Sequence, residues 1–160
     1  MKLAERPTSR IVLVNERDQV LLICYKDSSS TASSFWVTPG GGLETGETYE
    51  DAAKRELLEE TGIVVSAVGE PIWTRNKVVD GVLFLERHFL VRCANVNLII
   101  ENNPDANEQK LTLGMRWWNL EGLRASTMIY PEDLVLHLEP VLRGVIPVTP
   151  VDISRADLTQ

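Results

Sequence analysis

The sequence predicts an α/β protein in which helices pack on a mixed β-sheet. Short apolar runs of strand length, such as Ile11–Val14 and Val20–Tyr25, are separated by turn-forming residues. Two other segments, Tyr49–Thr61 and Pro131–Arg143, are bounded by residues that begin and end helices. These strands and helices do not alternate strictly along the chain, which favours a mixed sheet over a purely parallel one.

The residues before the first helix predict a β-hairpin and one further strand. Asn15–Asp18 is rich in turn formers and joins the first two apolar runs. Asp27–Ser34 consists of small and polar residues, which indicates a loop. Phe35–Thr38 is a short strand-like segment that ends where Pro39 and three glycines follow.

Both predicted helices have recognisable ends. Thr48 is a candidate N-cap of the first helix, with Asp51 three residues later, and Gly62 follows the last helical residue. The second helix has Pro131 in its first turn and Gly144 just after its end, which is the usual arrangement of these two residues.

The remaining strands are predicted around a second hairpin. Its turn is Asp80-Gly81, because Asp-Gly between apolar runs favours a two-residue hairpin loop. Residues 95–112 are polar and indicate a loop, in which only Val96–Ile100 has the character of a strand. The expected strands are Val64–Val68, Ile72–Val79, Val82–Cys93 and Arg116–Leu120.

We expect one domain over residues 1–160, of which 146–160 form an extended C-terminal tail interrupted by prolines. No apolar run is long enough to span a membrane, and the first residues lack the apolar core of a signal peptide. Cys24 and Cys93 lie in strand-like apolar runs, which favours two reduced thiols over a disulfide. A cytoplasmic location is therefore expected.

The charge balance disfavours nucleic acid as the main partner. Sixteen basic and 23 acidic residues give a formal net charge of −7. Binding to a nucleic-acid backbone depends on clustered lysine and arginine. A small anionic ligand remains compatible with this composition if local basic residues or a bound cation neutralise it.

The most informative feature is an acidic face on the first helix, next to three glycines. Glu56, Glu59 and Glu60 fall within an arc of about 100° on the predicted helix. Like charges at this spacing repel, and a hard divalent cation, Mg²⁺ or Mn²⁺, would offset that repulsion. The alternative is a solvated helix stabilised by ion pairs such as Arg55 with Glu59, but it leaves the glycine run of Gly40–Gly42 unexplained.

The segment Gly41–Ile63 resembles the signature of the Nudix hydrolases, G-x5-E-x7-R-E-U-x-E-E-x-G-U, where U is a bulky aliphatic residue. Every constrained position is filled. The matching residues are Gly41, Glu47, Arg55, Glu56, Leu57, Glu59, Glu60, Gly62 and Ile63. The resemblance implies a Nudix-type α/β/α sandwich and hydrolysis of a phosphoanhydride in a nucleoside diphosphate linked to another group.

The resemblance also assigns roles to residues. It implies that Glu56, Glu59 and Glu60 bind divalent cations, with the carbonyl of Gly40 as a further ligand. It implies that Arg55 orients these glutamates and that Glu47 pairs with Arg55. Leu57 and Ile63 would pack in the core. The proton of the attacking water would pass to a carboxylate, for which we consider Glu56 or a glutamate from a distal loop.

Candidates outside the signature are weaker. Glu108 lies in the polar loop before Trp117 and is either a further metal ligand or a solvated residue. Arg75, Glu86 and Arg87 lie on predicted strands and are candidate substrate-binding residues. The alternative for the two arginines is that they are exposed and bind no ligand. The alternative for Glu86 is that it forms a hydrogen-bonded polar pair with His88. Among the tryptophans, Trp73 is the candidate for stacking on a base, and His137 is expected at the surface.

The leading hypothesis is a cation-dependent pyrophosphohydrolase with a small nucleotide substrate. The alternative is a Nudix-like module that binds a nucleotide of the ADP-ribose type without cleaving it, although such modules typically lack some signature residues. Removal of pyrophosphate from RNA ends is a third hypothesis. The sequence does not determine the substrate, the general base, the number of metals or whether the protein forms a homodimer.

Overall fold

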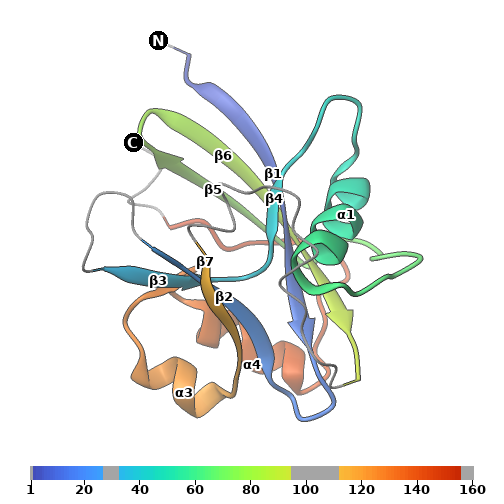
Figure 1. The fold of residues 1–160 in the computed structure, drawn as a ribbon, viewed down its shortest axis with the longest axis vertical. Helices are drawn as coiled ribbons and strands as arrows, with labels where there is room; N and C mark the ends of the chain where they lie inside the picture. The colour runs from blue at the N-terminus through green and yellow to red at the C-terminus, as the bar shows by residue number, and fades with distance from the viewer. Residues whose placement is uncertain (1, 27–32, 95–111, 156–160) are drawn as a thin grey trace.

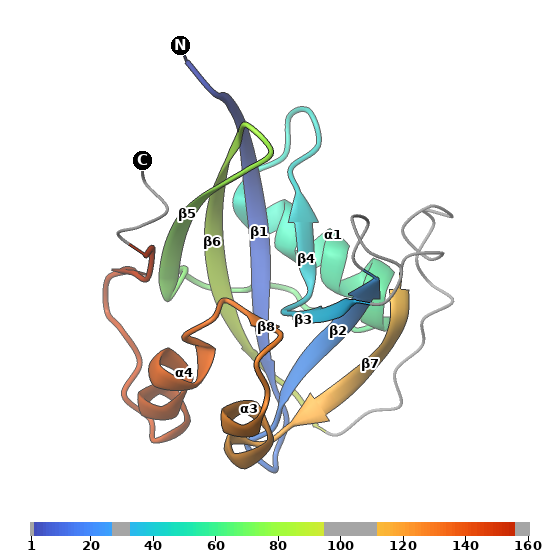
Figure 2. The same cartoon turned by 90° about the vertical axis from the view of Figure 1, so that its left-hand side faces the viewer.

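The computed structural model describes residues 2–26, 33–94 and 112–155. Within these residues a nine-stranded mixed sheet lies between helices on its two faces (Figures 1 and 2). Helix α1 (Tyr49–Thr61) packs on one face. Helices α3 (Leu120–Ala125) and α4 (Leu134–Leu142) pack on the other. The predicted fold class is confirmed.

Strand β1 (Ala4–Val14) is central to the sheet. It pairs in parallel with β6 (Val82–Arg92) on one side and antiparallel with β2 (Val20–Lys26) and β4 (Gly40–Gly42) on the other. Residues Ile11–Val14 are completely buried, because helices cover both faces of the strand. The outer strands are β5 (Trp73–Val79) and β9 (Val151–Asp152) beyond β6, and β7 (Thr112–Trp118), β3 (Ser34–Val37) and β8 (Ile129–Tyr130) on the side of β2.

The alternation of side chains along the strands creates two cores. Ile11 and Leu13 point toward α1 and pack with its Leu57. Val12 and Val14 point the other way and join the core formed by α3 and α4. This alternation decides which face each polar residue of β1, β5 and β6 occupies.

Most predicted elements are confirmed. The first hairpin is present with Val14 opposite Val20, and the second with Val79 opposite Val82. Helix α1 has the predicted bounds. Its N-terminus is a capping box in which Thr48 and Asp51 bond each other's backbone N–H groups, and Gly62 is the left-handed C-cap.

Four predicted elements were wrong in whole or in part. Val64–Val68 is not a strand, because Val68 packs inward while Val64 is 78% exposed and no partner strand is paired with the segment in the described chain. The strand expected at Arg116–Leu120 ends at Trp118, because the side chain of Asn119 accepts a bond from Gly122 N and caps α3.

The second helix begins at Leu134 instead of Pro131. Pro131 to Asp133 form a turn, in which Leu134 N donates to the carbonyl of Pro131 at 3.0 Å. The long strand ends at Arg92, one residue before its predicted end. Val96–Ile100 and residues 27–32 lie outside the described residues.

Within the described part of the tail, residues 146–155, the segment Val151–Ile153 packs on the sheet. Val151–Asp152 pairs in parallel with Trp73–Thr74, and Ile153 is buried in the core on the side of α4. Val148, in contrast, is 96% exposed.

Both cysteines are free thiols, Cys24 buried and Cys93 half-buried, as predicted. None of the described helices has the length and apolar character that crossing a membrane requires.

Candidate functional site

Local contacts fix the orientation of α1 relative to β1 and β4. The Ser9 hydroxyl on β1 donates to the carbonyl of Tyr49 at 2.6 Å, which anchors the first turn of the helix to the sheet. The apolar side of α1, with Ala53 and Leu57 completely buried, packs against the sheet. The acidic face of α1 is thereby held beside the glycine strand β4.

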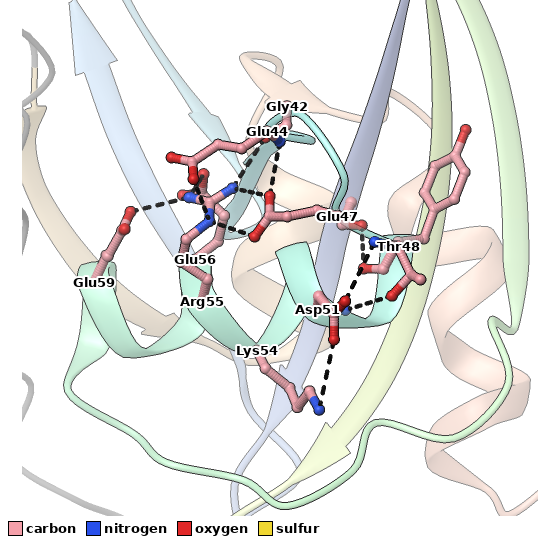
Figure 3. A network of polar contacts seen from close by, with 11 residues as sticks. Gly42, Glu44, Glu47, Thr48, Asp51, Lys54, Arg55, Glu56 and Glu59 are labelled. Carbon is pink, nitrogen blue, oxygen red and sulfur yellow. Dashed lines mark hydrogen bonds and ion pairs between the residues drawn. The ribbon is translucent and has the colours of Figure 1, made fainter.

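Arg55 is the centre of the site (Figure 3). Its Nε and Nη2 donate to the two carboxylate oxygens of Glu47, both at 2.8 Å, and Nη2 also donates to the carbonyl of Gly42 at 3.1 Å. Its Nη1 donates to Glu56 at 2.8 Å and to Glu59 at 3.3 Å. Arg55 therefore orients two of the three glutamates, and its expected pairing with Glu47 is present.

The glycines of β4 allow the close approach of the backbone to the helix. Gly40 has φ +146°, and a Cβ atom there would lie 2.0 Å from the carbonyl oxygen of Ser9. A Cβ atom on Gly41 would lie 2.3 Å from Oε1 of Glu56. The glycine run is therefore a steric requirement of the site.

Glu60 and Glu56 are both buried, which is unusual for carboxylates. Oε1 of Glu60 accepts the N–H of Gly40 at 3.0 Å, and the hydroxyl of Tyr25 donates to its Oε2 at 3.5 Å. Oε2 of Glu56 is buried and has no hydrogen-bond partner among the described residues. An unpaired buried carboxylate oxygen is costly and requires a cation, a donor or a water molecule.

The surroundings of the site lower the pKa of one carboxylate and raise that of another. The hydrogen bonds from Arg55 hold the pKa of Glu47 below its usual value. Burial, and then the charge of Glu56, raise the pKa of Glu59, although Arg55 acts in the other direction. The hydrogen bond to Glu47 raises the pKa of Arg55, so this guanidinium remains charged. The acidic face is thus only partly neutralised by Arg55.

The residues fit a hard divalent cation as oxygen ligands. Carboxylates and a backbone carbonyl are the donors that Mg²⁺ and Mn²⁺ prefer, and Glu56 offers an oxygen that nothing described satisfies. No three Asp, Glu, His or Cys side chains of the described chain already converge as a metal cage. Figure 3 shows the guanidinium of Arg55 joined by dashed lines to both Glu56 and Glu59.

Comparison with known proteins identifies the family. The model of the NUDIX domain matches residues 4–138. The chain belongs to the Nudix family. Solved Nudix structures have the same fold: the NUDIX hydrolase from Nitrosomonas europaea has a TM-score of 0.68 at 21% identity and covers 98% of this chain and 96% of its own. The MutT protein from Methanosarcina mazei Go1 has a TM-score of 0.71 at 18% identity, with 88% and 97% covered.

Curated Nudix relatives are similar over different shares of their length. The 8-oxo-dGDP phosphatase of Mus musculus is 30% identical over 127 residues, which are 79% of this chain and 35% of that protein. The RNA pyrophosphohydrolase of Wolbachia pipientis (subsp. Culex pipiens, strain wPip) is 29% identical over 147 residues, 81% and 83% of the two chains. A putative 8-oxo-dGTP diphosphatase of Bacillus subtilis is 44% identical over 52 residues, 32% of each chain. The chain thus spans about a third of the first and last of these relatives.

The structure places the other candidate residues of this Nudix chain on different faces of the sheet. Arg75 and Glu86 form a buried ion pair at 3.2 Å on the sheet face opposite α1. Arg87 lies on the α1 face, with its guanidinium 4.0 Å from the centre of the Tyr49 ring. Glu108 lies outside the described residues.

Two expectations for aromatic residues and histidines were wrong. Trp73 is not available to stack on a base, since it is 2% exposed in the core under α4. His137 is half-buried instead of exposed, with its ring 6.0 Å from that of Trp73. Both residues are covered because the second helix packs directly on β5, a contact that the sequence pattern did not indicate.

Sequence reasoning missed three residues near the site. The hydroxyl of Tyr25 reaches Glu60, and Arg10 and Lys77 flank Glu86 at 3.6 and 3.4 Å. Arg10 shares one face of β1 with Arg6 by the strand period of two, and this was a signal for the arginine. No local pattern pointed to Tyr25, because its contact depends on the packing of β2 beside α1.

Proposed function

We propose that this chain is a divalent-cation-dependent pyrophosphohydrolase. Its substrate is a nucleoside diphosphate linked to another moiety, and a water molecule cleaves the phosphoanhydride bond. The observation that carries the proposal is the buried pair Glu56 and Glu60 beside β4, in which one oxygen of Glu56 has no hydrogen-bond partner in the described part of the chain. The names of the relatives, a diphosphatase and an RNA pyrophosphohydrolase among them, support the same reaction class.

The residues of the site have different proposed roles. Glu56, Glu59 and Glu60, with the carbonyl of Gly40, are the ligands for the cation. When bound, the cation neutralises phosphate charge and makes water more acidic. Arg55 holds Glu56 and Glu59 at the positions described above, so that their oxygens are ordered before substrate arrives.

Glu56 also has the geometry of a general base. Its Oε1 is held by Arg55, while its Oε2 is buried without a partner in the described chain and is able to accept a proton from water. Glu108, outside the described residues, remains the second candidate for this role or for a metal ligand. Arg75, Glu86 and Arg87 are proposed to contribute to substrate binding, Arg75 and Glu86 as one buried unit.

A hydrolysis screen tests the proposal, with the products separated by chromatography, because cleavage of ADP-ribose or a nucleotide sugar gives two phosphate monoesters and no inorganic phosphate. The substrates are nucleoside triphosphates, oxidised nucleotides, ADP-ribose, dinucleoside polyphosphates and nucleotide sugars, each with Mg²⁺, with Mn²⁺ and with EDTA. We expect cation-dependent hydrolysis of at least one class and its loss in Glu56→Gln. Glu50→Gln is the matched control, because it removes the same charge from an exposed position of the same helix.

The competing function, a nucleotide-binding module of the ADP-ribose type, makes the opposite prediction. Such a module would bind a nucleotide without cleaving it under any cation condition. Turnover that is equally fast with EDTA would contradict the metal-dependent mechanism while leaving hydrolysis intact.

A further inference from the structure

A set of positively charged residues covers the part of the sheet that no described helix shields. Figure 2 shows α3 and α4 in front of one end of β1, β6 and β5, and no helix in front of the other end. Arg6 and Arg10 of β1, and Arg75 and Lys77 of β5, lie on this side of the sheet, opposite α1. We call these four residues the basic face.

The strand register places the basic face in ordered rows. Arg6 of β1 and Lys77 of β5 stand on either side of Phe84 in the middle strand β6. Their charged groups lie 5.6 and 5.5 Å from the centre of the Phe84 ring. In the next row, Arg75 stands beside Glu86.

The charges of this face do not cancel. Glu86 is buried, and its two carboxylate oxygens face Arg10 at 3.6 Å, Lys77 at 3.4 Å and Arg75 at 3.2 Å. Three positive side chains against one carboxylate leave an excess of two positive charges in a largely buried setting. Excess buried charge is unfavourable unless a counter-ion balances it.

The titration of neighbouring groups adds no negative charge. Burial lowers the pKa of His88, so this ring is neutral near pH 7 and does not change the balance. Burial alone would raise the pKa of Glu86, but the hydrogen bond with His88 and the charges of Arg10 and Lys77 outweigh it and hold this pKa below its usual range. Burial also lowers the pKa of Lys77, as expected for a cation with too few partners.

A small polar cavity opens among these groups. It has a volume of about 10 Å³, and its lining includes Arg10, Thr38, Lys77, Glu86, His88 and Tyr130. Nδ1 of His88 is buried there without a hydrogen-bond partner among the described residues. The cavity holds one water-sized group, so a larger anion would meet the ends of Arg10 and Lys77, whose side chains are 18% and 19% exposed.

The basic face adjoins the acidic site across one strand. A Cβ atom on Gly42 would lie 3.0 Å from Nε of Arg6, while the carbonyl of Gly42 accepts Arg55 from the other side. Arg10 is the register partner of Gly40, whose N–H binds Glu60. Of the described strands only β1 pairs with β4, so a ligand passing the outer edge of β4 reaches both sites.

We propose that the basic face binds a second phosphoryl group of the substrate, distinct from the anhydride that is cleaved. The inference rests on the proposed function, because it assumes a nucleotide at the glutamates. The net charge of −7 and the small number of cations favour a short anion over a long nucleic acid. The second group is either a terminal phosphate on the ribose or the phosphodiester of a following nucleotide.

Binding without metal isolates this face from the acidic site. We would measure the Kd values of AMP, adenosine 3′,5′-bisphosphate and the 5′-phosphorylated dinucleotide pApA by calorimetry in EDTA. For the wild type we expect at least one of the last two to bind about tenfold more tightly than AMP, as one added charge-assisted contact provides. If only the bisphosphate binds more tightly than AMP, the bound group is a terminal phosphate. If pApA binds more tightly to the same extent, the bound group is a phosphodiester.

The double variant Arg6→Gln/Lys77→Gln should reduce this preference to about twofold or less. Arg6 is exposed and Lys77 is half-buried, and glutamine keeps much of the length of each side chain, so the variant should fold, which a melting curve checks. Arg17→Gln is the matched control, because it removes the same charge from the exposed turn between β1 and β2. It should keep the full preference.

Two results would overturn the inference: equal Kd values of the wild type for all three nucleotides, or a preference that survives in the double variant. Neither result bears on the proposed function, which is decided by hydrolysis of the anhydride with Mg²⁺. The protein could also show a preference that depends on Arg6 and Lys77 and yet hydrolyse no anhydride. That result would support the anion site and refute the proposed hydrolase.

Discussion

Replacing Gly41 with alanine is a direct test of how tightly the site is built. The new Cβ atom would lie 2.3 Å from Oε1 and 2.7 Å from the carboxyl carbon of Glu56. Normal contacts of this kind are about 3.5 Å, so the carboxylate has to move by about 1 Å. The backbone of Gly41 does not have a positive φ, so alanine itself is not strained there.

The displacement should reduce activity more than stability. Glu56 is held by Arg55 at 2.8 Å, and a shift of about 1 Å breaks or distorts that bond. Misplacing a catalytic group by about 1 Å costs on the order of 100-fold in rate. Overpacking of this size destabilises a protein by about 1–3 kcal/mol.

The assay compares kcat/KM on the substrate identified in the screen with the free energy of unfolding in urea. Gly69→Ala is the control: Gly69 has φ +68° and open space around it. An alanine there costs about 1–2 kcal/mol of backbone strain but touches no site residue, so its kcat/KM should be unchanged. If Gly41→Ala keeps kcat/KM within twofold of the wild type, the position of Glu56 is not critical and the argument is refuted.

Further predictions concern stability and metal binding. Glu47→Gln should lower the free energy of unfolding at pH 7 by about 1.5–3 kcal/mol. Because the pKa of Glu47 is lowered in the folded protein, the difference in stability between wild type and variant should decrease as the pH falls below the usual pKa of 4.5. A difference that stays constant with pH would contradict this. Glu59→Gln should leave the metal-free protein equally or more stable at pH 7, since the pKa of Glu59 is raised and its charged form is disfavoured; a clear loss in urea unfolding would exclude this. Glu60→Gln should abolish most of the increase in Tm that saturating Mg²⁺ gives the wild type, and equal shifts would remove Glu60 from the ligand set. Ile153→Ala should destabilise by about 2–5 kcal/mol, whereas Val148→Ala, at an exposed position, should change stability by less than about 0.5 kcal/mol.

Local patterns were sufficient where neighbouring residues decide the conformation. Helix α1 was predicted to the residue because its capping box and its C-terminal glycine are contacts within the segment itself. The two hairpins follow from short turns between apolar runs. Where the outcome depends on distant partners the prediction was wrong, as for Val64–Val68, which has apolar residues but pairs with no strand of the described chain.

The sequence by itself determined the family, the acidic face of α1 and the pairing of Arg55 with the site glutamates, because these depend on the spacing of residues in and just before one helix. Only the tertiary structure decided that one oxygen of Glu56 has no hydrogen-bond partner among the described residues, since that requires β4 to lie against α1. It also decided the role of Glu86. On a lone strand this residue is an ordinary polar group, but pairing of β1 and β5 on either side of β6 surrounds it with Arg10, Arg75 and Lys77. The charge of Arg10 on β1 meets those of the β5–β6 hairpin only through sheet register, and no local pattern encodes their sum.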